Sequence, residues 1–102
     1  MTYVTRENIT DQVLEVFERT PDPRLRVVMQ SLVKHLHAFI REVEPSDEEF
    51  EKGCEFVVGL GKNTNEKKNE AILASDILGA STLITLINNV KRAESAGKYQ
   101  TE

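Results

Sequence analysis

The chain has 102 residues, a net charge of −4, and 39% hydrophobic and 29% charged residues. These values suit one globular domain with a modest core, and the acidic balance argues against nucleic acid as a partner. The lone cysteine, Cys54, excludes an internal disulfide and fits a reducing compartment. The apolar runs are too short for a membrane span, and residues 1–12 lack the order of a secretory signal. We therefore expect a cytoplasmic protein that is not transmembrane and binds no nucleic acid.

Two helices are expected in the first half of the chain, where hydrophobic residues recur with the helical period. The first covers about residues 5–19 and ends before Pro21, because a residue that precedes proline avoids the α region. The second covers residues 23–44, since Asp22 is a good N-cap and Pro23 suits the first helical position. Its apolar stripe comprises Leu25, Val28, Met29, Leu32, Leu36, Phe39, Ile40 and Val43.

Three further helices are expected in the second half. The third begins at Ser46, which can form a capping box with Glu49, and weakens at its final glycines. The fourth covers about residues 66–78 and ends at Gly79, which favours a left-handed conformation. The fifth follows directly. The side chains expected to face inward are Phe50, Cys54, Val57 and Val58 on the third helix, and Leu83, Ile84, Ile87 and Val90 on the fifth.

The sequence thus predicts an all-α fold, a compact bundle of about five helices, over residues 1–92. Residues 93–102 have no apolar period and are expected to form a frayed tail. The most hydrophobic segment, residues 71–90, contains a single acidic side chain, that of Asp76. This segment forms either the core of the monomer or part of a buried interface.

Asp76 is the charged side chain that most needs an explanation. An unpaired buried carboxylate is costly, so this group must be paired, capped or solvated. Asp76 either helps to cap the fifth helix across the break at Gly79 or lies at a solvated edge, or else it lines a ligand pocket. The residues alone leave both interpretations open.

The histidines and the cysteine do not form a recognisable reactive site. His35 and His37 are two residues apart and point to different sides of a helix, whereas helical metal ligands are three or four residues apart. We expect both rings to pack or hydrogen-bond locally, and we predict no metal site. Cys54 follows Phe50 and Glu51 on a helix and is expected to be a small core residue rather than a reactive thiol.

The order and spacing of residues over about 5–90 resemble the N-terminal helical domain of intradiol ring-cleavage dioxygenases. Within that family the chain looks most like the hydroxyquinol and catechol 1,2-dioxygenases. The resemblance includes the acidic opening of the third helix and Phe50, where the family often has tryptophan. The other segments that carry it are residues 22–25 (DPRL), 30–43 (QSLVKHLHAFIREV) and 72–81 (ILASDILGAS).

The resemblance implies a helical dimerisation domain. In the family this domain precedes a β-sandwich that holds non-haem Fe(III) with two tyrosines and two histidines. Two helical domains pack along the dimer axis, and in several members the interface encloses an apolar tunnel occupied by a phospholipid. In the hydroxyquinol-type enzymes, the leucine and aspartate that match Leu73 and Asp76 reach the edge of the substrate pocket. The resemblance therefore favours the pocket interpretation of Asp76.

The catalytic sandwich of the family has no counterpart in this sequence. The two tyrosines, Tyr3 and Tyr99, match no iron ligand, and His35 and His37 belong to the helical domain. We therefore expect no cofactor in this chain, because the family's Fe(III) site lies in the other domain. We also expect no catalysis by the chain on its own.

Three hypotheses for the function follow. The first is a non-catalytic interaction module that forms a homodimer and holds an apolar ligand, such as a fatty acid or phospholipid tail, at the seam. The alternative is the N-terminal part, or a separate subunit, of a non-haem Fe(III) dioxygenase that cleaves catechol or hydroxyquinol in aromatic catabolism, with a separate or lost catalytic chain. The third is a regulator that competes for the dimer surface of a full-length dioxygenase. The expected dimer or ligand surface comprises Val13, Phe17, Leu83, Ile84 and Ile87.

Overall fold

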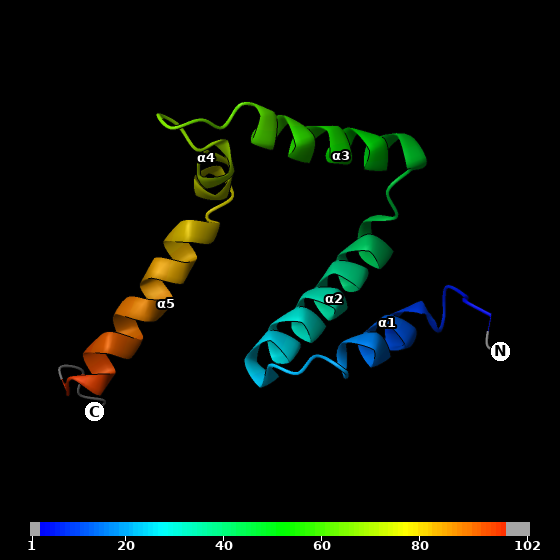
Figure 1. Cartoon of the computed structure of the whole chain (residues 1–102), viewed down its shortest axis with the longest axis horizontal. Helices are drawn as coiled ribbons and strands as arrows, with labels where there is room; N and C mark the ends of the chain where they lie inside the picture. Colours follow the sequence, from blue (N-terminus) through cyan, green and yellow to red (C-terminus); the bar gives the residue numbers. More distant parts are fainter. Residues whose placement is uncertain (1–2, 98–102) are drawn as a thin grey trace. The chain divides into compact units, whose positions relative to one another are not determined.

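Five α-helices account for most of residues 3–97, the part of the chain that the computed structural model describes (Figure 1). No strand occurs within these residues, so the expected all-α fold with five helices is confirmed. Of the described residues, 3–47 form one compact unit and 48–97 form a second. The helices are α1 (Ile9–Phe17), α2 (Pro23–Val43), α3 (Asp47–Lys62), α4 (Glu70–Ile77) and α5 (Ala80–Ser95).

The ends of α2 follow from local chemistry. Asp22 caps the helix, because its Oδ1 accepts from the backbone N–H groups of Arg24 and Leu25 at 2.9 and 3.2 Å. At the other end, Glu44 adopts a left-handed conformation with φ 52° and ψ 58°, and its N–H donates to the Ile40 carbonyl at 2.8 Å. The helix therefore ends at Val43, one residue before the expected boundary.

Helix α1 begins later than the periodicity predicts. The side chains of Thr5 and Asn8 each accept a hydrogen bond from the other's backbone N–H, at 3.1 and 2.8 Å. These bonds stabilise a turn over residues 6–8, so the helix starts at Ile9 instead of near residue 5. Short polar side chains offer the backbone such alternatives to helix.

Helix α1 packs on α2 around one buried side chain. Val33 on α2 is 7% exposed and is the one hydrophobic residue of the described range that counts as buried. Met29 and His37, four residues before and after Val33, lie on the same face of α2 and are half-buried. On α1, Ile9, Val13, Leu14 and Phe17 are half-buried. The apolar contact between the two helices is therefore narrow.

Polar bonds supplement this narrow contact at both ends of the helix pair. At one end, Gln30 Nε2 donates to the Leu14 carbonyl at 3.3 Å and to Glu18 Oε1 at 2.8 Å. At the other end, Thr10 Oγ1 lies 2.7 Å from His37 Nδ1 and accepts from Arg41 Nη1 at 2.8 Å. Arg41 Nη2 also donates to the Arg6 carbonyl at 2.8 Å. We call the group formed by Thr10, His37, Arg41 and the Arg6 carbonyl the Thr10 clasp.

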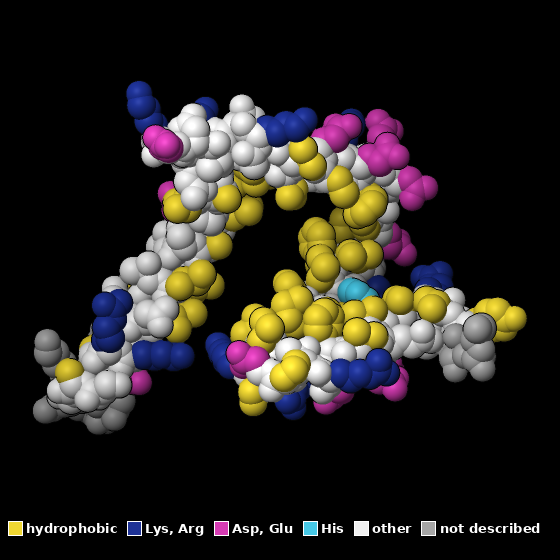
Figure 2. Space-filling view, in the orientation of Figure 1, with side chains coloured by type: hydrophobic (Ala, Val, Ile, Leu, Met, Phe, Trp, Pro, Cys, Tyr) yellow, Lys and Arg dark blue, Asp and Glu magenta, His cyan; other side chains and the backbone are white. Residues whose placement is uncertain are grey.

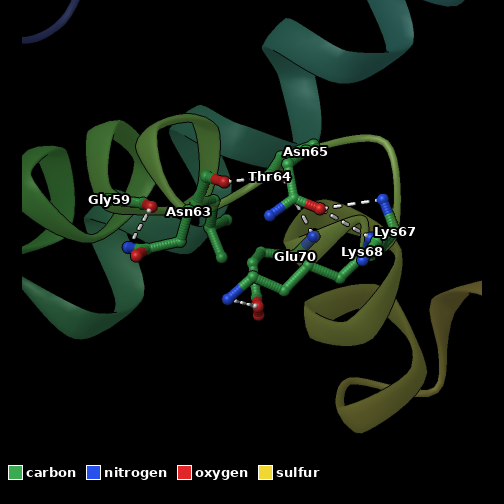
Figure 3. A network of polar contacts seen from close by, with 8 residues as sticks. Gly59, Asn63, Thr64, Asn65, Lys67, Lys68 and Glu70 are labelled. Atoms are coloured by element: carbon green, nitrogen blue, oxygen red, sulfur yellow. Dashed lines mark hydrogen bonds and ion pairs between the residues drawn. The ribbon is translucent and has the colours of Figure 1, made fainter.

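The segment between α3 and α4 is a polar loop, and it corrects the predicted start of the fourth helix. Thr64 Oγ1 donates to the Leu60 carbonyl at 2.7 Å and accepts from the Glu70 N–H at 3.0 Å. Asn65 Oδ1 accepts from the N–H groups of Lys67 and Lys68 at 2.8 and 3.1 Å (Figure 3). Residues 66–69 are therefore held in a turn, and α4 begins at Glu70 instead of residue 66.

Helices α4 and α5 contact each other at a sharp bend. Gly79 has φ 76°, the left-handed conformation that the sequence predicts there. The two helices are bent by 77° relative to each other. Within the described residues no single helix has the length and apolarity needed to cross a bilayer, although α4 and α5 taken together, as a bent pair, meet that criterion.

The C-terminal helix extends beyond the expected domain boundary at residue 92. Helix α5 continues to Ser95, and the N–H of Ala96 donates to the Arg92 carbonyl at 3.0 Å. The start of the expected tail is thus helical. Residues 98–102, which include Tyr99, lie outside the described residues.

Candidate functional site

Leu73 and Asp76, the expected pocket-edge residues, lie on one face of α4. They are three residues apart, so a helix places their side chains close together. Leu73 is 51% exposed and Asp76 is also exposed. The helix begins with a conventional cap, because Asn69 Oδ1 accepts from the Ile72 N–H at 3.1 Å. Both side chains are therefore held on a regular helix and are open to contact with another group.

Asp76 is hydrogen-bonded across the bend between α4 and α5. The hydroxyl of Ser81, in the first turn of α5, donates to Asp76 Oδ1. The carboxylate thus bonds to a side chain of the next helix, and it remains exposed to solvent. Nothing in the sequence pattern singled out Ser81 as this partner, although its position in the first turn after Gly79 places it within reach.

The five residues expected to form a dimer or ligand surface divide between the two units. Leu83, Ile84 and Ile87 are all exposed on one side of α5, with Ile84 at 60%. Val13 and Phe17 share a face of α1, the helix that packs on α2, and both are half-buried there. The three α5 residues are therefore fully available for an interaction, whereas the two α1 residues already take part in the α1–α2 unit.

A wider apolar face, which the expected site did not include, runs along α2. This face is turned away from α1 by roughly a quarter turn, because helical residues advance by about 100° each. Figure 2 shows hydrophobic side chains gathered along α2 and along α5. We call the first group the α2 stripe; its exposed members are Leu25, Val28, Leu32, Leu36, Phe39, Ile40 and Val43. The periodicity had revealed the stripe but not that it is uncovered.

The expectation that the apolar residues of α3 and α5 face inward is wrong. On α5 the residues concerned, Leu83, Ile84, Ile87 and Val90, are all exposed. Phe50 is 68% exposed, and Cys54, Val57 and Val58 are exposed as well. Helix α3 packs on no other helix of its unit within the described residues, so it has no neighbour that could cover these side chains. Cys54 is consequently a free, exposed thiol and not a core residue.

The two histidines have separate structural roles. His35 bonds within its own helix, with Nδ1 2.8 Å from the Ser31 carbonyl, as expected. His37 instead bonds to Thr10 on another helix. Within the described part of the chain, no three side chains of His, Cys, Asp or Glu gather closely enough to hold a metal ion. Because His35 and His37 lie on different sides of α2, the described residues do not supply two histidines that converge on one ion.

Comparison with known proteins assigns most of the chain to a family. Residues 22–96 match the family model described as the catechol dioxygenase N terminus. The chain belongs to the catechol dioxygenase N-terminal family. The match covers α2 to α5 and leaves α1 outside. The family assignment and the resemblance found in the sequence are therefore in agreement.

Relatives of this catechol dioxygenase N-terminal domain include hydroxyquinol 1,2-dioxygenases from two bacteria. The enzyme of Nocardioides simplex is 47% identical over 83 residues, which cover 81% of this chain and 28% of the relative. The enzyme of Rhodococcus opacus is 40% identical over 87 residues, which cover 85% of this chain and 29% of the relative. This chain thus spans less than a third of the length of the curated relatives it matches.

A solved structure agrees with these relatives. The crystal structure of hydroxyquinol 1,2-dioxygenase from Pseudomonas putida DLL-E4 matches with a TM-score of 0.80 and 41% identity. The match covers 82% of this chain and 30% of that chain. The helical domain described here therefore corresponds to less than a third of the length of the solved chain that it matches.

Proposed function

We propose that this chain is a dimerisation element of the intradiol dioxygenase type, in which a second copy of the chain covers the exposed apolar faces. The observation that carries the proposal is the exposure of both the α2 stripe and the α5 residues Leu83, Ile84 and Ile87. Contiguous exposed apolar patches beyond a few hundred Å² normally mark an interaction site. Helix α2 has 21 residues, so its stripe extends over roughly 30 Å.

A second copy is the occupant that best suits these faces. The stripe residues of α2 are uncharged, so they offer no charge pattern by which a charged partner would be selected. Two identical apolar faces satisfy each other across a two-fold axis without any further complementarity. Obligate homodimer interfaces are of this apolar kind.

The oligomeric state tests this proposal. Size-exclusion chromatography with light scattering should give about twice the chain mass of 11.6 kDa at micromolar concentration. A monomer of 11.6 kDa that persists at 100 µM, about the upper limit for a weak homodimer, would reject the proposal. The test needs neither iron nor substrate.

An apolar ligand at the seam is the second part of this proposal. The α5 residues Leu83, Ile84 and Ile87 are aliphatic and exposed together, so they could contact a fatty acyl chain as well as another helix. Native mass spectrometry of the purified chain should show an added mass of one lipid, which organic extraction removes. A protein of bare mass, in preparations that were never delipidated, would contradict this part alone.

A second candidate function is the N-terminal part of a hydroxyquinol-cleaving enzyme. It is favoured by the identity of 47% and 40% to two hydroxyquinol 1,2-dioxygenases, together with the shared exposed face of Leu73 and Asp76. In such an enzyme these two side chains would contact the substrate, whose iron-dependent chemistry would take place on other residues. A downstream reading frame with tyrosine and histidine iron ligands would support this candidate.

Turnover separates the two candidates. The purified chain with added iron should show no cleavage of hydroxyquinol. Addition of a protein segment encoded downstream should restore cleavage if the second candidate is right. Substitution of Asp76 by Asn in the restored enzyme should then change KM for hydroxyquinol and leave the oligomeric state unchanged.

A further inference from the structure

A pocket lies at the end of the α1–α2 unit that contains the Thr10 clasp. Its volume is about 510 Å³, within the range of roughly 300–1,000 Å³ that is typical for small-molecule sites. Its lining is part apolar and part charged, and all of it comes from the first unit. The lining residues are Arg6, Ile9, His37, Ile40, Arg41, Glu44 and Pro45. Arg6 and Ile9 precede the region that matches the family model.

We infer that this pocket binds a small organic monoanion, a carboxylate with an apolar body. The lining includes the guanidinium groups of Arg6 and Arg41 and the single carboxylate of Glu44, so the charged side chains of the pocket carry a net positive charge. Guanidinium groups bind carboxylates through paired, charge-assisted hydrogen bonds. Ile9, Ile40 and Pro45 provide an apolar surface for the rest of the ligand. One lining residue, Ile40, also belongs to the α2 stripe, so the pocket adjoins the face that the proposed dimer would cover.

Arg41 is held in place before any ligand binds. Its Nη1 donates to Thr10 and its Nη2 to the Arg6 carbonyl, each at 2.8 Å. These bonds use two of the five N–H groups of a guanidinium, so three remain for a ligand. A donor that is already fixed loses less conformational entropy when it binds.

Arg6 provides the second cation, which is more exposed to solvent. Its Nε lies 3.9 Å from Glu7 Oε1, and both side chains are largely exposed, at 86% and 78%. An exposed pair at this distance contributes little, so Arg6 can leave Glu7 for a ligand at little cost. Because Nδ1 of His37 is engaged by Thr10, Nε2 is the ring nitrogen left for a ligand. The carboxylate of Glu44 repels an anionic ligand, and the repulsion is smaller for a ligand with one negative charge than for one with two.

The test is a titration of the full chain with sodium benzoate at constant ionic strength, followed by ¹H–¹⁵N NMR. We expect chemical-shift changes at the lining residues and saturation at millimolar concentration. Benzyl alcohol, which lacks the charge, and inorganic phosphate, which lacks the apolar body, should each bind at least about fivefold more weakly. Vesicles of phosphatidylglycerol serve as a further arm. Binding to the vesicles without binding to benzoate would overturn the inference of a free carboxylate ligand.

Three variants localise the site. Arg6→Gln should weaken benzoate binding about fivefold, because it removes a cation without touching the Arg6 carbonyl that accepts from Arg41. Glu44→Gln should strengthen binding about twofold, since the opposing charge is lost. Arg24→Gln is the matched control at the other end of α2 and should bind like the original chain. Unchanged affinity in Arg6→Gln, or an equal loss in Arg24→Gln, would overturn the site.

Discussion

The side chain of Thr10 on α1 meets the ring of His37 on α2 at 2.7 Å, although the two residues are 27 positions apart. The same hydroxyl oxygen accepts from Arg41 at 2.8 Å. One threonine therefore joins two side chains of α2 to α1. Because Val33 is the single buried hydrophobic residue in the described range, this polar bond network has little apolar burial to support it.

Thr10→Val should destabilise the α1–α2 unit. The valine keeps the shape of the side chain but removes both hydrogen bonds, so the free energy of unfolding should fall by about 1–3 kcal/mol. Urea denaturation measured by circular dichroism gives this value, and amide hydrogen exchange should speed up in α1. Thr10→Ser keeps the hydroxyl and should recover most of the loss. Equal stability of the valine and serine variants would contradict a role for the bonds.

Gly79→Ala should destabilise the bend between α4 and α5 through backbone conformation alone. A Cβ at Gly79 would meet no atom within 4 Å, so no steric clash with neighbours contributes. The cost comes from φ 76°, a backbone conformation in which alanine is strained and glycine is not. The free energy of unfolding should therefore fall by about 1–2 kcal/mol. Thermal unfolding should show the loss.

Gly53→Ala is the matched control for that experiment. Gly53 lies inside α3 without a positive φ, and its added Cβ also meets no atom within 4 Å. Alanine is the better helix former, so this variant should gain up to about 1 kcal/mol. Opposite signs for the two variants would confirm that backbone conformation decides the effect, whereas a loss at both positions would contradict it.

The local signals in the sequence were sufficient for α2 but not for α1 and α4. Asp22 and Pro23 define the start of α2 through bonds within a few residues, and these can be deduced from residue type. The starts of α1 and α4 depend on hydrogen bonds between side chains and the backbone at Asn8 and Thr64. Where these bonds form, the residues just before the helix adopt a non-helical conformation; where they do not, the helix can begin earlier. Residue type allows both outcomes, so the predicted helices began four residues too early.

The residues of the candidate site could be predicted from the sequence, but the packing around them could not. The periodicity showed which residues share a face, as for Leu83 and Ile87 on α5, but it carries no information about what covers that face. For the same reason Phe50 and Cys54 were expected in a core and are exposed. The Thr10 clasp was missed because its partners lie 27 to 35 residues apart and follow no period.

Glu44→Gly should stabilise the end of α2. Glu44 is the one non-glycine residue in residues 3–97 with a positive φ, at 52°. Glycine adopts this conformation without the steric cost of a Cβ, so the free energy of unfolding should rise by about 1 kcal/mol. The measurement is a chemical denaturation curve. Glu42→Gly, inside the helix, should lose about 1 kcal/mol instead, and a gain in that control would contradict the explanation.

The double substitution Ile84→Lys and Ile87→Lys should abolish the proposed dimer. Two charges on the exposed apolar face of α5 would have to be desolvated without partners at an apolar interface. Light scattering should then give the mass of a single chain, while circular dichroism remains that of a helical protein. Thr82→Lys, on the opposite side of α5, is the control and should remain dimeric. A dimer that survives the double substitution would show that α5 lies outside the interface.

The narrow α1–α2 contact also has a calorimetric consequence. The heat capacity change of unfolding follows the apolar area that becomes hydrated, and a helix pair with one buried valine has little such area to expose. A chain whose α2 stripe stays exposed to solvent should therefore unfold with a small heat capacity increment. Because little packing enthalpy is lost, its thermal transition should also be broad. A sharp transition with a large heat capacity increment would instead show that the α2 stripe was already buried before heating began.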